Sequence, residues 1–456
     1  MSNFITIGNA QGFWGDSPDA PARLIEQYPQ LDYLTLDYLA EVSLSIMAMQ
    51  KSRDPETGYA RDFINVIDSL VPHWKAGSTT KIVCNAGGLN PRACAEATLA
   101  ALAKHGITDK KVALVTGDDV LELLQADPGC DTYRNWESDQ PASAIADQLN
   151  TANAYIGADG VVEALALGAD IVLTGRVADP SLTLGACMHA FGWADDDYDK
   201  LAAGTIAGHI LECGTQACGG ISTDWLDIPD PVNIGFPIVE VYEDGRLVVT
   251  KPDGTGGNVT EATVKEQLLY EIGDPCNYIS PDCKVDFTTL QVSKMDTDRV
   301  EVTNASGAAP TDTYKVSATY ADGYWAQGML TIFGRDAQEK AERCGDIVLQ
   351  KLKRAGFEYD RSNIEVIGAN AVVKDVLDAP KLRECVLRIA VADQRKEAVV
   401  RFAKEIAPLV TSGPQGTTGY AAGRPKPSPV FAYWPCLIAK DKVTVHTELL
   451  TQGDAS

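Results

Sequence analysis

One short stretch, Thr205–Trp225 with the sequence TIAGHILECGTQACGGISTDW, carries several side chains that can do chemistry. If its first half is helical, His209, Glu212 and Cys213 stand at i, i+3 and i+4 and project from one face, and Gly214 is expected to end the helix. An imidazole beside a carboxylate can transfer protons, and a thiol beside an imidazole can be activated as a nucleophile. The alternative is that Cys213 and His209 serve only packing.

The composition bounds what such a site can serve. A chain of 456 residues with 45% hydrophobic content can bury the cores of two or three domains. Its net charge of −24 argues against a nucleic-acid partner, because phosphate binding needs a concentrated basic surface. No apolar run is long enough for a membrane span, so we expect a cytoplasmic protein that does not bind membranes.

Motifs for metals, cofactors and other nucleophiles are missing from the sequence. The eleven cysteines are scattered without a CxxC pair, which favours reduced thiols over disulfides or structural zinc. The turns GNAQGFWG and CNAGGLNP match neither the dinucleotide fingerprint nor the phosphate loop, and neither HExxH nor GxSxG occurs. We therefore expect no metal and no cofactor.

Residues 1–226 alternate strand-like and helix-like segments. Six apolar runs, FITIGNA, LDYLTLDYL, KIVC, KVALVT, NAYIG and DIVLT, are each followed by a turn and a helical pattern. Ser17, Asn90 and Asp179 precede prolines that suit the first helical turn, and each is expected to cap or begin a helix. The pattern predicts an α/β domain whose parallel sheet carries helices on both faces.

In such sheets, ligands bind outside the carboxyl ends of the strands. The polar residues and glycines that follow the predicted strands are therefore the candidate site. Asp16 and Glu41 are expected as secondary carboxylates beside His209 and Glu212. The candidates for substrate binding are Asn9, Gln11, Asn85, Gly87, Gly88, Asn90, Arg92, Asp118, Thr174, Arg176 and Asp179.

Residues 227–456 are expected to form an α+β second domain. The Asp244–Gly245 pair between two β-branched runs predicts a hairpin, and Thr260 is expected to cap a helix. Further strand-like runs and two helical patterns follow. The Gly/Pro-rich segment near the end contains PVFAYWPCLI, which indicates that it packs back on the body before a closing strand, VTVHTEL.

Several stretches together resemble the acyclic terpene utilisation AtuA-like family over nearly the whole chain. They are GNAQGFWGDSPDAP, CNAGGLNP, YIGADGVVEALALGADIVLTGRVADPSL, GHILECGTQACGG, KPDGTGGNVTEATVKEQLLYEI and APLVTSGPQGTTGYAAGRP. The resemblance implies a role in catabolism through acyl-CoA intermediates. It assigns no catalytic residue, so the candidate sites depend on position alone.

The leading hypothesis is a hydratase-type lyase that acts on a small carboxylic acid or an acyl-CoA. His209 or Glu212 would be the general acid or base, and Asn85 with the amides of Gly87 and Gly88 would hold a developing enolate oxygen. One alternative is a hydrolase or acyl transferase with Cys213 as nucleophile. Another is a noncatalytic subunit of a catabolic complex. A homo-oligomer is expected.

Overall fold

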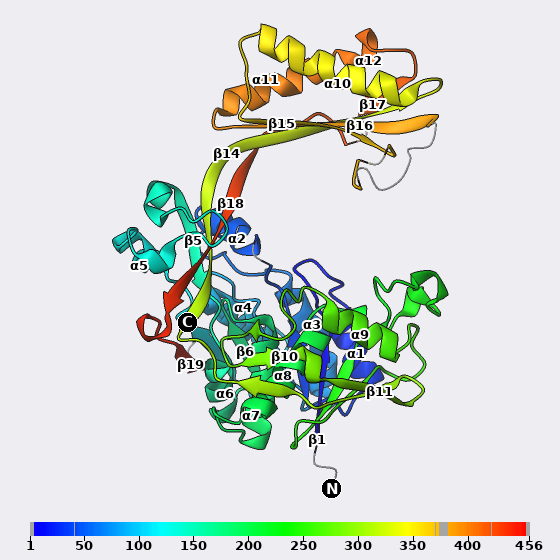
Figure 1. Ribbon diagram of the computed structural model, residues 1–456. Coiled ribbons are helices and arrows are strands. Elements are labelled where there is room, and N and C mark those ends of the chain that lie inside the picture. The colour runs from blue at the N-terminus through cyan, green and yellow to red at the C-terminus, as the bar shows by residue number, and fades with distance from the viewer. Residues whose placement is uncertain (1–3, 41, 370, 374–381, 421, 453–456) are drawn as a thin grey trace. The chain divides into compact units, whose positions relative to one another are not determined.

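The computed structural model describes residues 4–40, 42–369, 371–373, 382–420 and 422–452. The chain divides into two compact units, Met1–Thr319 with Tyr433–Ser456, and Tyr320–Ala432 (Figure 1). This division differs from the predicted boundary between residues 226 and 227. Strands beyond residue 227 pair with the first strand of the chain, so they belong to the same unit as the N-terminal half.

The first unit contains most of the secondary structure. Its N-terminal elements are β1 (Phe4–Asn9), α1 (Ala20–Gln27), β2 (Tyr33–Leu36), α2 (Ser43–Lys51), α3 (Phe63–Lys75), β3 (Lys81–Cys84), α4 (Pro91–Lys104), β4 (Val112–Thr116), α5 (Leu121–Ala126), β5 (Leu149–Ala154), α6 (Asp159–Ala166), β6 (Ile171–Thr174), α7 (Asp179–Phe191) and α8 (Tyr198–Leu211). Those that follow are β7 (Ile238–Tyr242), β8 (Leu247–Thr250), α9 (Glu261–Leu269), β9 (Tyr278–Ile279), β10 (Lys284–Asp286), β11 (Gln291–Asp296), β12 (Arg299–Thr303), β13 (Ser306–Ala308), the start of β14 (Thr313–Phe333), the end of β18 (Ser428–Ala439) and β19 (His446–Leu450).

Within the described residues the main sheet has ten strands, in the order β11-β12-β8-β7-β1-β2-β3-β6-β4-β19. Its centre, β1-β2-β3-β6-β4, is parallel, as the alternation of strands and helices predicts. Antiparallel strands extend both edges: the β7–β8 hairpin pairs with β1, and the C-terminal β19 pairs with β4. The predicted α/β class is confirmed.

Helices cover both faces of the parallel centre. On one face α1, α3 and α4 pack over a core that includes Leu34, Ile82 and Leu173. On the other face α6, α7 and α8 contact one another and the sheet, and Figure 1 shows them gathered together. The strands are short and almost wholly buried, so the residues directly after them lie at the edge where the helices begin.

Some local predictions match the structure and others differ from it. Asn90 caps α4 by accepting a hydrogen bond from the Ala93 backbone N–H, and Thr260 caps α9. In contrast, α1 begins at Ala20 and not at Pro18, so Ser17 is not its cap. The predicted fifth strand, β5, pairs with β14 and stays outside the parallel centre.

The second unit, Tyr320–Ala432, is an antiparallel sheet with helices. Its elements are the remainder of β14, α10 (Ala337–Arg354), β15 (Arg361–Ile367), β16 (Glu384–Asp393), α11 (Lys396–Ile406), α12 (Leu409–Ser412), β17 (Thr417–Tyr420) and the start of β18. The strand order is β15-β16-β14-β17, and alternate residues of β14 and β16 face α10 and α11 across a common core. Leu330, Val348, Leu387 and Phe402 are central to that core.

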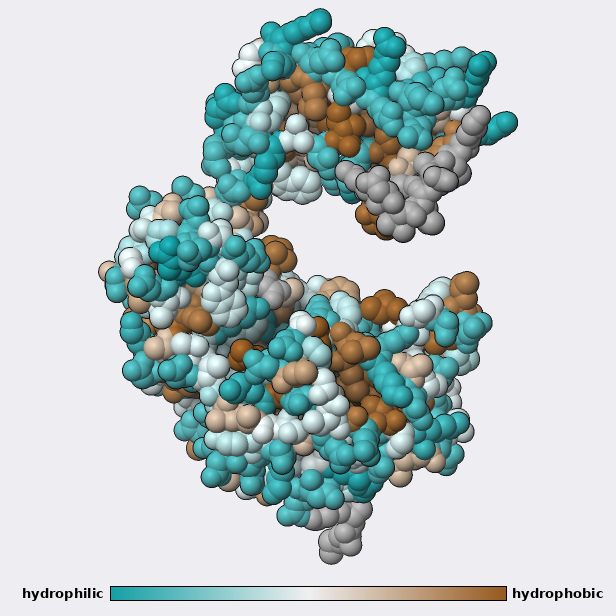
Figure 2. All heavy atoms as spheres, viewed as in Figure 1, coloured by the Kyte–Doolittle hydropathy of each residue, from teal (hydrophilic) through white to brown (hydrophobic). Residues whose placement is uncertain are grey.

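Hydrophilic side chains cover most of the visible surface, with scattered hydrophobic patches between them (Figure 2). This distribution agrees with the excess of Asp and Glu over Lys and Arg, 63 against 39. Among the described helices, none is long and apolar enough to cross a membrane.

Candidate functional site

The carboxyl ends of the parallel strands hold a buried network of polar side chains. Asp37 follows β2, Asn85 follows β3, and the two are joined by a hydrogen bond of 2.6 Å from Asn85 Nδ2 to Asp37 Oδ1. The side-chain oxygen of Asn85, Oδ1, accepts from the Tyr38 backbone N–H at 2.7 Å. Both side chains are buried, so Asn85 fixes the position of the Asp37 carboxyl group.

Arg176, which follows β6, is the largest of the fully buried side chains, with 1% of its surface exposed. Its Nη1 donates to the Leu39 carbonyl at 2.6 Å, and its guanidinium forms an ion pair with Asp179 at the start of α7. Its backbone N–H donates to Asp118 Oδ2, which also accepts from Asn153. The guanidinium therefore links the ends of β2 and β6. Its positive charge also stabilises the ionised form of nearby carboxyl groups, which burial alone would disfavour.

Burial changes the acidity of this network. It raises the pKa of Asp37 to about 6, although Arg176 and the hydrogen bond from Asn85 act in the opposite direction. It raises the pKa of Asp118 to about 6 as well, against the hydrogen bonds from Arg176 and Asn153. These carboxyl groups therefore change protonation state closer to neutral pH than exposed carboxyl groups, whose pKa is about 4.

His209 and Glu212 lie at the end of α8, and the predicted i, i+3 pairing is present. His209 Nδ1 and Glu212 Oε1 are 2.7 Å apart. An ionised carboxylate only accepts, so this bond places the proton on Nδ1 and leaves Nε2 with a lone pair. His209 is 2% exposed, and its Nε2 has no hydrogen-bond partner among the described residues.

The surroundings of His209 fix its orientation. The Phe287 ring meets the imidazole edge to face with 5.7 Å between centroids, and the Tyr278 ring lies 6.4 Å away. Gln267 from α9 donates to the His209 carbonyl oxygen at 2.7 Å. Gly214 follows with a φ of +59°, so the chain leaves the helix directly after the pair.

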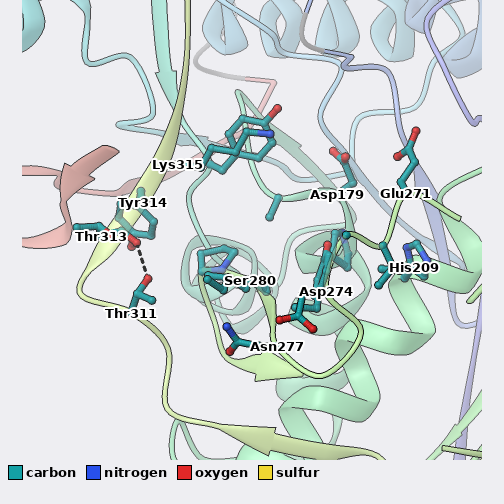
Figure 3. A pocket seen from close by; sticks show the side chains of 18 of the residues that line it. Asp179, His209, Glu271, Asp274, Asn277, Ser280, Thr311, Thr313, Tyr314 and Lys315 are labelled. Atoms are coloured by element: carbon teal, nitrogen blue, oxygen red, sulfur yellow. Dashed lines mark hydrogen bonds between the residues drawn. The ribbon is translucent and has the colours of Figure 1, made fainter. Parts of the chain in front are cut away.

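A cavity of about 520 Å³ lies beside His209, and all of its lining residues belong to the first unit. Asp179, His209 and Glu271 lie toward one side of it in Figure 3, and Thr311, Thr313 and Tyr314 toward the other. The volume falls within the range of small-molecule sites. The cavity is lined by Trp136, Tyr155, Ala178, Asp179, Pro180, His209, Glu212, Glu271, Ile272, Gly273, Asp274, Asn277, Tyr278, Ile279, Ser280, Pro281, Thr311, Thr313, Tyr314, Lys315 and Leu437.

A second cavity of about 500 Å³ shares part of this lining. Asp179, Glu212 and Glu271 border both cavities, and the second one also reaches Asp16 and Asp37. Glu212 therefore contacts His209 beside the first cavity and also borders the second cavity, which has several acidic side chains in its lining. Two ligand-sized spaces thus share three acidic side chains, among them the half-buried Glu212.

Cys213 borders the second cavity but lacks the properties of an activated nucleophile. Burial and the nearby Glu212 carboxylate raise the pKa of its thiol to about 12. His209 Nδ1 is bonded to Glu212 and its Nε2 has no partner among the described residues, so the imidazole forms no hydrogen bond with Cys213 there. A neutral thiol without a base is a poor nucleophile.

The turn after β3 serves packing more than ligand binding. The Gly88 backbone N–H donates to the Asn85 carbonyl, and a Cβ on Gly87 would lie 2.6 Å from the Thr174 carbonyl oxygen. Asn90 donates to backbone carbonyls of residues 55 and 57 as well as capping α4. Arg92 pairs with Glu448 on the surface. None of these four residues lines either cavity.

The turn after β1 lies closer to the site. Asn9 accepts from the Gln11 backbone N–H at 2.8 Å, and the Gln11 carbonyl accepts from the Asp37 backbone N–H at 2.9 Å. Asp16 borders the second cavity and accepts from Gly12 at 3.1 Å. The Thr174 side chain is buried, and its hydroxyl group donates a hydrogen bond to the Gly175 carbonyl oxygen. Glu41 lies outside the described residues.

Several residues of the site are missing from the sequence-based candidates. Asp37 lies within the apolar run LDYLTLDYL, which conceals where its strand ends, whereas the structure ends β2 at Leu36. Tyr155 and Glu271 come from loops, Tyr278 from β9 and Lys315 from β14, with no local pattern that marks them. The described residues contain no group of three or more His, Cys, Asp or Glu side chains arranged to hold a metal ion.

Fold and site together define an α/β protein with a cleft at the carboxyl ends of its parallel strands, where a buried histidine is paired with a half-buried glutamate. A family profile described as "Acyclic terpene utilisation family protein AtuA" matches residues 5–449, and the chain belongs to this family. Comparison with curated proteins and with solved structures gives no match. The resemblance expected from the sequence motifs is thereby confirmed.

Proposed function

We propose that the protein is an enzyme of acid–base type, a lyase that adds water to or removes it from a small acyl compound in the utilisation of terpenes. One observation carries the proposal: His209 Nε2 is buried at the first cavity with no hydrogen-bond partner among the described residues, while Nδ1 is held by Glu212 at 2.7 Å. A general base needs this arrangement, with one nitrogen oriented and the other directed to the substrate.

The pair supports a balanced proton cycle. Nε2 takes a proton from water as the water oxygen bonds to the β-carbon of an unsaturated acyl group, and the double bond opens. The imidazolium formed beside Glu212 is stabilised by the carboxylate. It then returns the proton to the α-carbon, so one water is added and the imidazole is restored.

The family supports the biological context of this chemistry. Terpene utilisation implies breakdown of branched, unsaturated carbon skeletons, and addition of water to a double bond beside a carbonyl group is a reaction open to such substrates. The cavity beside His209 mixes aromatic and apolar walls, such as Tyr278 and Leu437, with polar groups, as an acyl compound requires.

The experiment measures exchange of the α-hydrogen in 3-methylbut-2-enoate, its hydrated product and their CoA thioesters in deuterated water, by proton NMR. The wild-type protein is expected to exchange at least one of these compounds. The His209→Gln variant is expected to lose at least about 10²-fold in rate, since it lacks the basic nitrogen.

A matched control comes from a second histidine–carboxylate pair on the surface of the first unit. His105 Nε2 and Asp68 Oδ1 are 2.9 Å apart, and neither residue is among the described residues that line the two cavities of the candidate site. The His105→Gln variant should therefore exchange at the wild-type rate within about twofold. Equal rates for the wild-type protein and the His209→Gln variant would contradict the proposal.

A further inference from the structure

Lys315 places a positive charge at the first cavity. Of its described lining residues, Lys315 is the one Lys or Arg, and it projects from β14. Its Nζ lies 4.5 Å from the centre of the Tyr155 ring, and its carbonyl oxygen accepts from the Tyr155 backbone N–H at 2.9 Å. Backbone and side chain of Lys315 are thus both held against one aromatic residue.

Tyr155 is itself tied to the buried network. The guanidinium of Arg176 lies 4.2 Å from the centre of the same ring, and Arg176 is bonded to the Leu39 carbonyl. The ring therefore lies against a side chain that cannot move without breaking buried hydrogen bonds. This contact fixes the side of the cavity on which the Lys315 ammonium group is held.

The other charged groups among the described lining residues of the first cavity are acidic. Asp179, Glu212, Glu271 and Asp274 line it, and Figure 3 shows Lys315 apart from His209 and Glu271. An anionic group of a ligand is attracted to Lys315 and repelled by the carboxylates, so it has one favourable position. A ligand with several negative charges meets repulsion from four carboxylates against attraction from one ammonium group.

We infer that the site takes a free monocarboxylic acid as its monoanion, with the carboxylate bound by Lys315 and the hydrocarbon chain between the aromatic walls. The orientation of the bound acid toward His209 rests on the proposed function, whereas the binding of its carboxylate by Lys315 does not. A CoA thioester has a neutral carbonyl in place of the carboxylate and carries several phosphate charges. The structure thus favours the free acid over its thioester.

Isothermal titration calorimetry with three probes of equal chain length tests the inference. Octanoate is expected to bind at least tenfold more tightly than octanamide, which has the same shape without the charge, and more tightly than octanoyl-CoA. Failure of octanoate to bind, or equal or tighter binding of octanamide or octanoyl-CoA, overturns the inference.

Two variants locate the charge that binds the probe. Lys315→Met keeps the length of the side chain and should weaken octanoate at least tenfold while leaving octanamide within twofold. Lys315→Arg retains the cation and should retain the preference for octanoate. Thermal unfolding of each variant is measured beside the titration. If Lys315→Met is unfolded, loss of the preference for octanoate in a folded Lys315→Arg overturns the inference.

Two further variants distinguish a failure of the inference about Lys315 from a failure of the proposed function. Lys104 is exposed at the end of α4 and lines neither cavity, so Lys104→Met should bind octanoate like the wild-type protein. His209→Gln should still bind octanoate within about threefold but lose hydrogen exchange. Loss of octanoate preference in Lys104→Met, or its persistence in a folded Lys315→Met, contradicts the role of Lys315; an active His209→Gln contradicts only the proposed function.

Discussion

The Glu212 carboxyl group holds His209 Nδ1 at 2.7 Å and also borders both cavities of the first unit. The contact depends on their i, i+3 spacing at the end of α8, where Glu212 is the residue that ends the helix. His209 borders the first cavity alone. Glu212 can thus orient and stabilise the imidazole from the side opposite the proposed substrate.

The Glu212→Gln variant should lower the turnover number about 10²-fold with little change in KM. A glutamine oxygen can still accept from Nδ1, so the imidazole keeps its orientation, but the imidazolium formed during proton transfer loses its negative neighbour. Steady-state kinetics on the acid that shows exchange would measure both constants.

Glu271 supplies the control for that variant. It borders the same two cavities, so Glu271→Gln removes the same charge from the same walls. Its turnover number should stay within about threefold of wild type. Equal losses in both variants would mean that the charge of the cavity matters and the contact with His209 does not.

Alkylation should distinguish Cys213 from an activated cysteine. Because burial raises the pKa of its thiol to about 12, very little thiolate is present at pH 8. Iodoacetamide followed by mass spectrometry should label the exposed Cys276 long before Cys213. The Cys213→Ala variant should also retain full turnover. Preferential labelling of Cys213 would revive the alternative of a cysteine nucleophile.

The sequence predicted those features of the fold and the site that depend on residues only a few positions apart. The Asn90–Pro91 start of α4, the Asp244–Gly245 hairpin and the His209–Glu212 pair all follow from rules that span a few residues. The rule for parallel sheets also led to Arg176, which lies in the network that the strand ends form.

Long-range pairing determined what the sequence did not predict. Nothing near residues 238–250 specifies that this hairpin joins β1, and so the unit boundary falls after Thr319. Lys315 reaches Tyr155 because β5 pairs with β14, across a separation of more than 150 residues. The Gly87–Gly88 turn satisfies the pattern of an anion site, but neighbouring groups fill the space.

The close approach of two turns offers a test of how the site is held together. A Cβ on Gly12 would lie 2.7 Å from the Gly214 backbone nitrogen, so Gly12→Ala must push the turn after β1 away from the end of α8. We expect a loss of about 1–3 kcal/mol in the free energy of unfolding. Gly129→Ala, where a Cβ meets nothing closer than 3.9 Å, should change it by less than about 0.5 kcal/mol. Urea titration of both variants measures the difference.

The buried Asp118 should make stability depend on pH in a defined direction. Burial raises its pKa from 3.8 to about 6, so the folded protein retains a proton that the unfolded chain releases between these values. The free energy of unfolding should therefore fall as the pH rises from about 4 to about 6, by up to about 3 kcal/mol from this group. Asp118→Asn should make the dependence shallower by about 2 kcal/mol between pH 4.5 and pH 7 in urea titrations, because the unfolded carboxyl group is already mostly ionised at pH 4.5. Asn at the exposed neighbour Asp119 should leave the dependence unchanged. A steeper fall in Asp118→Asn would mean that the carboxylate is stabilised by Arg176 and Asn153 more than burial disfavours it.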